Sequence, residues 1–198
     1  MKIALCATHL FNMTLPQDRD YIGVDHGVEE LLKQEITPRF AIGDFDSLQN
    51  RQTLENLNIQ ILPERKDVTD THAAIEYAIS KGYDEIEIYG ATGGRLDHFF
   101  AVMCLLEKYQ DIKLKVIDQQ NCIQLLKPGK HYIYNQGYYY FSLFALNESI
   151  ISIDQAEYTL DRYLLKREDP LCVSNEVKGE YAIIENSGNI ILVQSRDA

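Results

Sequence analysis

The chain has 198 residues, a formal net charge of −11 at pH 7 and a sequence pI of about 4.9. Hydrophobic residues make up 45% of the chain and charged residues 25%, which is ordinary for a globular protein with a sizeable core. An acidic protein repels the phosphate backbone of nucleic acids, so we expect no nucleic-acid partner. No apolar stretch approaches the roughly 20 residues that cross a bilayer, so we expect no membrane partner either.

The cysteines and the N-terminus indicate a cytoplasmic protein. The cysteines stand far apart, without CxxC spacing, which is typical of free thiols in a reducing compartment; they are Cys6, Cys104, Cys122 and Cys172. The opening stretch MKIALCATHLF has one lysine and a short apolar run. It predicts a first β-strand rather than a signal peptide, which needs a longer apolar segment.

Strand-like and helix-like segments alternate over roughly the first 125 residues, a pattern that indicates a parallel sheet with crossover helices. The expected strands are 2–7, 21–24, 39–42, 59–62, 85–89 and 113–117. Apolar residues recur at helical spacing in 69–82, and 96–109 has an apolar face expected to pack in the core through Phe99, Phe100, Met103 and Leu106. We therefore predict an α/β protein whose N-terminal domain, residues 1–126, is a Rossmann-like open parallel sheet.

The composition changes near Lys127, where KPGK forms a turn-rich junction. The following segments are rich in Ile, Tyr and Phe and show weak helical spacing, and IIENSGNIIL predicts a hairpin that turns at 186–189. Residues 127–198 are therefore expected to form an antiparallel β-sandwich domain. A domain this small should pack on the first domain or on a second copy of the chain.

Three loops that follow predicted strands carry polar residues suited to chemistry. GDFDS follows the third strand and supplies Asp44 and Asp46, and ERKDVTD follows the fourth and supplies Lys66, Thr69 and Asp70. GATGGRLDH follows the fifth. In open α/β sheets, ligands bind beyond the carboxyl ends of the strands. We therefore expect the three loops to line one crevice.

The first two loops also have plainer explanations. Asp44 and Asp46 could form a surface turn, because aspartate is common in turns. Thr69 or Asp70 could cap the helix that follows. The loop GATGGRLDH is harder to explain in this way, because its glycines let backbone N–H groups approach an anion and the next helix begins there. Its glycine spacing matches neither GxGxxG nor GxxxxGK[ST], so alone it is a moderate signal for phosphate.

Together the loops predict a magnesium and polyphosphate site. Crowded carboxylates raise one another's pKa, and a hard divalent cation removes that repulsion. Mg²⁺ typically takes one or two carboxylates together with phosphate oxygens and water. The expected carboxylates are Asp44, Asp46, Asp70 and Asp97, with Arg95 and Lys66 neutralising the polyphosphate. The histidines show no HExxH arrangement, so a zinc site is not expected, and His98 is expected to orient Asp97 or contact substrate.

In this order and spacing, GDFDS, KDVTD and GATGGRLDH resemble the motifs of bacterial-type thiamine pyrophosphokinases. VDHG resembles the family's early acidic-glycine motif and VSNEV its late Ser-Asn motif, so the resemblance covers nearly the whole chain. It implies that ATP and thiamine give AMP and thiamine diphosphate with Mg²⁺, in a homodimer. It also implies that the first domain holds the nucleotide, whereas the β-sandwich helps to form the thiamine pocket at the subunit interface.

The resemblance assigns roles residue by residue. The catalytic positions are Asp46, Asp70, Asp97 and Arg95, and the metal positions are Asp44, Asp46, Asp70 and Asp97. The nucleotide positions are Asp25, Lys66, Thr69, Thr92, Gly93, Gly94 and Arg95. The positions that would bind thiamine are Asp70, His98, Ser174 and Asn175. Without the resemblance, Ser174 and Asn175 would suggest only a plain β-turn. The proton of the thiamine hydroxyl would pass to a carboxylate, either Asp70 or Asp97.

The sequence departs from the family pattern in two places. The first loop, CATHLFNMTLP, lacks the family's glycine-rich turn, and the chain has no tryptophan to stack on thiamine. A tyrosine, such as one of 138–140, or a phenylalanine is expected to replace the tryptophan.

Two other functions are alternatives to the kinase. One is a haloacid-dehalogenase-type phosphatase, whose DxD motif usually follows the first strand, and the other is a magnesium–nucleotide sensor without turnover.

Overall fold

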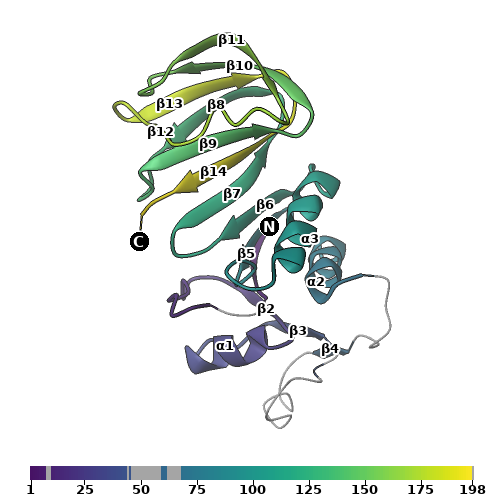
Figure 1. Ribbon diagram of the computed structural model, residues 1–198. Helices are drawn as coiled ribbons and strands as arrows, with labels where there is room; N and C mark the ends of the chain where they lie inside the picture. Colours follow the sequence, from purple (N-terminus) through teal and green to yellow (C-terminus); the bar gives the residue numbers. More distant parts are fainter. Residues whose placement is uncertain (8–9, 44, 46–58, 62–67, 198) are drawn as a thin grey trace. The chain divides into compact units, whose positions relative to one another are not determined.

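Figure 1 shows the computed structural model, which describes residues 1–7, 10–43, 45, 59–61 and 68–197. The chain divides into two compact units, Met1–Asp118 and Gln119–Ala198. Parallel strands build the first unit and antiparallel strands the second, which confirms the predicted α/β class. The functional division between residues 126 and 127 stays a prediction.

The first unit is built on a parallel sheet in which β1 is central. The strands are β1 (Lys2–Cys6), β2 (Tyr21–Val24), β3 (Phe40–Gly43), β4 (Ile59–Ile61), β5 (Glu85–Tyr89) and β6 (Lys113–Ile117). They pair in the order β6-β5-β1-β2-β3-β4, and Cys6 lies between Gly23 of β2 and Tyr89 of β5. Residues 3–6 of β1 are fully buried, as expected for a strand covered on both faces.

The described part of this unit contains three helices: α1 (Gly27–Lys33), α2 (Asp70–Ser80) and α3 (Leu96–Lys108). The last two match the predicted helical segments closely. Helix α1 packs on β1 and β2. Its start lies so close to β1 that a Cβ at Gly27 would be 2.0 Å from the carbonyl oxygen of Cys6. A residue larger than glycine would therefore push this helix away from the sheet.

The buried face of α3 differs from the prediction. Val102, Leu105 and Leu106 are buried, whereas Phe100 is 65% exposed. At about 100° per residue, Phe100 lies on the opposite side of the helix from Val102. The expectation that Phe100 packs in the core of this unit is wrong.

A charged network crosses the amino-terminal half of the sheet. The side chain of Glu87 on β5 is 6% exposed and lies 2.8 Å from Lys2 Nζ and 2.6 Å from Arg19 Nε. The Tyr89 hydroxyl donates to the same carboxylate over 3.0 Å. Burial alone would raise the pKa of Glu87, but the hydrogen bonds from Lys2 and Tyr89 and the charge of Arg19 lower it overall. The network ties β1, β5 and the 10–20 segment together.

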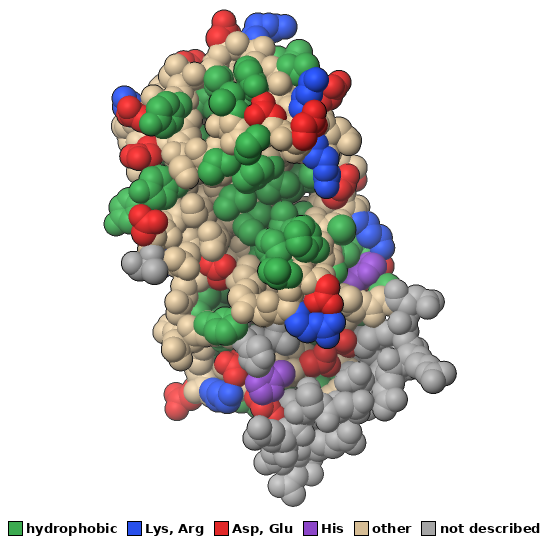
Figure 2. All heavy atoms as spheres, in the orientation of Figure 1, with side chains coloured by type: hydrophobic (Ala, Val, Ile, Leu, Met, Phe, Trp, Pro, Cys, Tyr) green, Lys and Arg blue, Asp and Glu red, His purple; other side chains and the backbone are tan. Residues whose placement is uncertain are grey.

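The second unit is a sandwich of two antiparallel sheets. One has the order β12-β9-β14-β7 and the other is four-stranded, with the order β11-β10-β13-β8. The strands are β7 (Asn121–Leu126), β8 (Gly129–Tyr134), β9 (Tyr140–Ala145), β10 (Glu148–Asp154), β11 (Leu160–Lys166), β12 (Asn175–Glu176), β13 (Tyr181–Asn186) and β14 (Ile190–Ser195). Both sheets supply the core, for example through Phe141 and Leu192 from one and Ile151 and Ile184 from the other. Hydrophobic side chains also gather on the face shown in Figure 2.

The predicted hairpin at IIENSGNIIL is wrong, because its two strands belong to different sheets. β13 pairs with β8 and β10, whereas β14 pairs with β7 and β9. The turn between them crosses the sandwich. Asn186 Nδ2 donates to the carbonyl oxygens of Lys127 and Gly188, and the Ser187 amide donates to Ile150 O. These bonds anchor the turn to the β7–β8 connection and to β10.

We predict that Glu87→Gln lowers the free energy of unfolding at pH 7 by about 2 kcal/mol, because a hydrogen-bonded buried charge is lost. The pKa of Glu87 is lowered in the folded state, so its contribution is present above the ordinary glutamate pKa. It is lost as the pH falls through the folded value. Urea unfolding at pH 7 and at acidic pH measures both effects.

The matched control is Glu85→Gln on the same strand, where the side chain is 31% exposed. A loss for Glu87→Gln no larger than that for Glu85→Gln, or one that does not shrink in acid, would contradict this account of the network.

Candidate active site

The strand order defines where a ligand should bind in the first unit. From β1 the chain proceeds outward through β2, β3 and β4, and then returns to the other side of β1 with β5 and β6. The order therefore reverses between β1 and β5. In open α/β sheets the crevice at such a reversal is the usual ligand site. The loops that follow β1 and β5 flank it.

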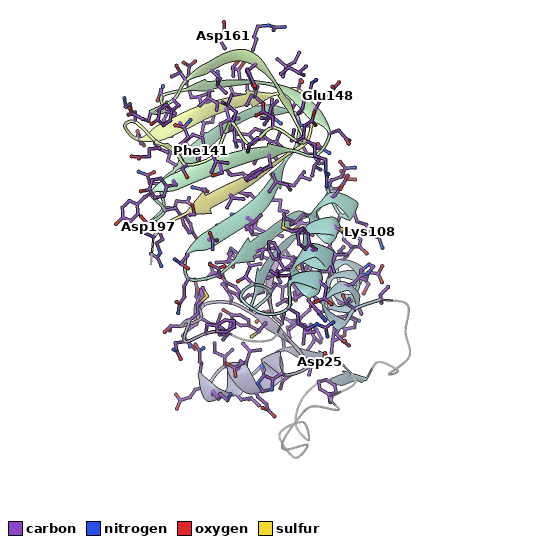
Figure 3. The ribbon with its side chains drawn as sticks, in the orientation of Figure 1. Asp25, Lys108, Phe141, Glu148, Asp161 and Asp197 are labelled. Carbon is purple, nitrogen blue, oxygen red and sulfur yellow. The ribbon has the colours of Figure 1, made fainter. Side chains whose placement is uncertain are left out.

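The loop after β2 directs a carboxylate toward the end of β3. Asp25, labelled in Figure 3, has a left-handed backbone with φ of 46°, and its amide donates to Ile42 O over 3.0 Å. Gly43 makes room for this side chain, since a Cβ there would lie 1.8 Å from Asp25 Oδ1. The carboxylate thus lies against the residue that directly precedes Asp44. Asp44, Asp46 and Lys66 themselves lie outside the described residues.

The loop after β5 is the glycine-rich segment 90–94. The Thr92 hydroxyl donates to Asp118 Oδ2 over 2.7 Å. Asp118 directly follows β6, so a second strand end fixes this loop. Sequence reasoning missed Asp118, although a carboxylate after the strand KLKVI was a usable signal. The predicted nucleotide residue Thr92 is therefore held in place by a neighbouring acid.

The loop after β1 contacts the glycine-rich segment from the other side. Phe11 and Asn12 have φ of 46° and 66°, and the Met13 amide donates to Leu10 O over 2.8 Å, which makes a tight turn. The turn sets the Phe11 ring against Gly93, where an added Cβ would be 2.7 Å from ring atom Cε2. The first loop, which lacks a glycine-rich turn, thus takes part in the site through an aromatic ring.

Arg95 and Asp97 form an ion pair at the start of α3. Arg95 Nε and Nη2 donate to the two carboxylate oxygens of Asp97 over 3.1 and 2.5 Å. The hydrogen bond from Arg95 lowers the pKa of Asp97 to about 2, and the His98 amide, 3.0 Å from Oδ1, acts in the same direction. The two side chains are 74% and 62% exposed, so solvent screens the pair. An incoming anion can therefore take Arg95 from Asp97 at little cost.

The start of α2 holds the remaining described acid of the predicted cluster. Thr69 is the N-cap, and its hydroxyl accepts from the His72 amide over 3.3 Å, so the capping explanation is confirmed for Thr69. Asp70 is the first helical residue. The His72 ring lies 2.8 Å from the Tyr109 hydroxyl just after α3. The first turn of α2 thus contacts the end of α3 opposite to Asp97.

Within the described ranges, no three His, Cys, Asp or Glu side chains gather into a group that could hold a metal ion. The described acids at the carboxyl edge are nevertheless hard oxygen donors, which suit Mg²⁺ rather than a soft metal. Asp25 is held against the residue next to Asp44. The donor chemistry therefore fits magnesium, and the metal positions stay predictions.

A pocket of about 440 Å³ opens in the second unit. Its lining is mostly apolar and includes the predicted thiamine-side residues; it comprises Ile153, Tyr158, Leu160, Leu171, Cys172, Val173, Ser174 and Asn175. Burial raises the pKa of the Cys172 thiol to about 11, so this wall is uncharged at neutral pH. Tyr158 is 67% exposed at the pocket, whereas residues 138–140 do not line it. Sequence reasoning missed Tyr158, one tyrosine among 13.

Two structural features define the class of protein. A parallel α/β unit carries a glycine-rich loop and acids at the reversal of its strand order, and a β-sandwich with an apolar pocket follows it. Residues 12–117 match the family model described as thiamin pyrophosphokinase, catalytic domain, and residues 130–191 match thiamin pyrophosphokinase, vitamin B1 binding domain. The chain belongs to the thiamine pyrophosphokinase family, a family of enzymes.

Relatives cover both units. The chain is 35% identical over 189 residues to thiamine pyrophosphokinase of Bacillus subtilis, covering 89% of this chain and 87% of the relative. The crystal structure of the Bacillus subtilis thiamine pyrophosphokinase matches with a TM-score of 0.89 at 30% identity, covering 100% of both chains. That of the Geobacillus thermodenitrificans thiamin pyrophosphokinase also has a TM-score of 0.89, at 28% identity, and covers 100% of this chain and 99% of that one.

The family assignment argues against the haloacid-dehalogenase-type phosphatase.

Across the residues that the structure describes, no helix is both long and apolar enough to cross a membrane.

We predict that Gly93→Ala lowers the free energy of unfolding by about 1–3 kcal/mol, because φ is +77° and the new Cβ would meet the Phe11 ring. Gly94→Ala is the matched control, since a Cβ at Gly94 meets nothing within 4 Å. Chemical denaturation of both variants measures the difference. Equal stability of the two variants would contradict the contact between the first loop and the glycine-rich loop.

Proposed function

We propose that the protein transfers a pyrophosphoryl group from ATP to the hydroxyl of thiamine, giving thiamine diphosphate and AMP. The observation that carries the proposal is the match of both units, in order, to the catalytic and vitamin B1 binding domains of one family. The placement of the glycine-rich loop at the reversal of the strand order supports the same conclusion.

The nucleotide is proposed to bind along the loop that follows β5. Backbone N–H groups of Gly93 and Gly94 and the first turn of α3 favour an anion there. Arg95 would leave Asp97 and pair with the polyphosphate, which both neutralises the phosphate and frees the carboxylate. Thr69 and Lys66 are proposed to lie on the same side of the nucleotide, with Asp25 beside the end of β3.

Magnesium is proposed to be held by Asp44, Asp46 and Asp97. Asp70 begins α2, whose first turn contacts the end of α3 far from Asp97, so its place among the ligands rests on the family resemblance alone. When bound, Mg²⁺ would neutralise and orient the polyphosphate oxygens. In a chain with a net charge of −11, such neutralisation is what allows an anionic nucleotide to bind. The carboxylates of this chain supply the hard ligands for it, and Arg95 supplies a further positive charge.

The reaction needs positioning and charge neutralisation rather than a covalent intermediate. The thiamine hydroxyl oxygen forms a bond to the β-phosphorus, the bond between that phosphorus and the bridging oxygen of the α-phosphate breaks, and AMP leaves with the electron pair. The hydroxyl proton passes to a carboxylate. Asp97 is a weak proton acceptor while Arg95 holds its pKa near 2, and it becomes a better one when Arg95 moves to the polyphosphate, so Asp70 and Asp97 are both proposed as acceptors.

Thiamine is proposed to use the pocket of the second unit, with His98 on the catalytic side. Tyr158 offers an exposed aromatic ring beside Ser174 and Asn175, and an aromatic face attracts a cationic ring such as the thiazolium. Tyr158 therefore replaces residues 138–140 as the proposed stacking residue. We propose a cytoplasmic homodimer, which the exposed apolar side chains of the second unit would suit.

We predict that Asp46→Asn lowers thiamine diphosphate formation at least about 100-fold, because the variant loses one charged ligand for magnesium. Its circular dichroism and thermal unfolding should match those of the wild-type protein. Asp161→Asn is the control: it removes the same charge from an exposed position on β11, labelled in Figure 3, and should keep full turnover.

Turnover of Asp46→Asn close to the wild-type rate would remove the metal-site proposal. Wild-type protein that binds ATP and thiamine but yields no product with Mg²⁺ would instead favour a nucleotide sensor.

A further inference from the structure

The side chain of Asn175 is committed to the backbone of another loop. Asn175 is 4% exposed, and its Oδ1 accepts from the Tyr158 amide over 3.0 Å and from the Glu176 amide over 2.9 Å. Its Nδ2 donates to the Tyr158 carbonyl oxygen over 2.7 Å. An asparagine amide has two acceptor and two donor positions, so three of the four are used within the protein.

These bonds extend a pairing that already joins the two segments. The Glu157 amide donates to Glu176 O over 2.9 Å, and the Lys178 amide donates to Gln155 O over 2.8 Å. Tyr158 itself lies between β10 and β11 and outside every named strand. The Asn175 carboxamide therefore takes the place of a partner strand, bonding both polar groups of the Tyr158 main chain.

The result is a fixed main chain that carries a free ring. Tyr158 is 67% exposed although both of its backbone polar groups are bonded. Next to Asn175, the Ser174 backbone is left-handed with φ of 58°, and its amide donates to Ser142 Oγ over 3.0 Å. An aromatic ring whose backbone is already ordered loses less conformational freedom when a ligand stacks on it.

We propose that Asn175 is a positioning residue. It holds the main chain of Tyr158, whose ring stacks on the substrate, and it does not itself bind thiamine. The inference rests on the proposed function, in which thiamine occupies the pocket lined by Tyr158, and it replaces direct substrate binding as the role of Asn175. Truncation of Asn175 should act on thiamine only by releasing Tyr158.

A double-mutant cycle tests this relation. We expect Asn175→Ala and Tyr158→Leu each to raise the KM for thiamine about tenfold, a loss of about 1.4 kcal/mol, with a smaller change in kcat. The double variant should be within about twofold of Tyr158→Leu alone, because residues that act as a unit are not additive. Losses that multiply in the double variant would overturn the proposal, since Asn175 would then act independently of Tyr158.

Amide hydrogen exchange gives a readout that does not depend on thiamine. The Tyr158 amide should exchange at least about tenfold faster in Asn175→Ala than in the wild-type protein, because its acceptor is lost. Unchanged protection would overturn the proposal. Should wild-type protein fail to use thiamine, the proposed function would fall, and the exchange result would still decide whether Asn175 holds this loop.

Two further variants separate positioning from general destabilisation. Asn186→Ala removes another buried asparagine of the same sandwich, 7% exposed and outside the pocket, and should lower stability without changing the KM for thiamine. Asn175→Asp serves if Asn175→Ala folds poorly: it keeps the acceptor for the Tyr158 amide but loses the donor to its carbonyl oxygen. A raised KM in Asn186→Ala equal to that of Asn175→Ala would contradict a specific role.

Discussion

The structure of the first unit depends on the parallel pairing of β1 with β2 on one side and β5 on the other. This pairing places the chain reversal beside β1, and the loops after β1 and β5 must then meet at the carboxyl edge. The contact between Phe11 and Gly93 is a direct result. So is the position of Asp25, which bonds to the end of β3 because β2 and β3 are neighbours. Residues distant in sequence therefore meet at the same edge of the sheet.

Charge is the second constraint on the site. An acidic chain that is proposed to bind a polyphosphate must supply positive charge locally, and two of its described carboxylates are neutralised in different ways. Glu87 is neutralised permanently by Lys2 and Arg19 inside the sheet, where it serves stability. Asp97 is neutralised by Arg95 on the surface, where the pair is exposed and can open. The first arrangement suits a fixed network, and the second suits a group that changes partners when an anion arrives.

Much of the fold could be predicted from sequence, because local patterns decided it. Alternating segments predicted the parallel sheet, and apolar spacing predicted α2 and α3. The hairpin prediction failed because the sequence of a turn such as 186–189 is similar whether the flanking strands pair with each other or lie in opposite sheets of a sandwich. Only the long-range pairing of each strand distinguishes the two arrangements. The burial of Phe100 was predicted wrongly because a broad apolar stripe on a helix does not show which part of the stripe packs against the rest of the protein.

Residues of the candidate site could be proposed from sequence where a motif contains them, but not where only tertiary contacts bring them into place. The glycine-rich loop and the acids after the strands follow from local sequence. Asp118 and Tyr158 do not, because their roles come from a hydrogen bond to Thr92 and from the pocket beside Asn175. Asn175 shows the same limit from the other side: its motif indicated a ligand contact, whereas its amide is bonded to the Tyr158 backbone.

The most direct test of the central claim follows the phosphorus atoms. Purified protein would be mixed with thiamine, Mg²⁺ and ATP labelled at the β-phosphate, and the products separated. The proposed reaction gives one AMP for each thiamine diphosphate, with the β-label in the thiamine product. ADP with thiamine monophosphate, and the β-label left in the nucleotide, would contradict attack at the β-phosphorus and with it the proposed reaction.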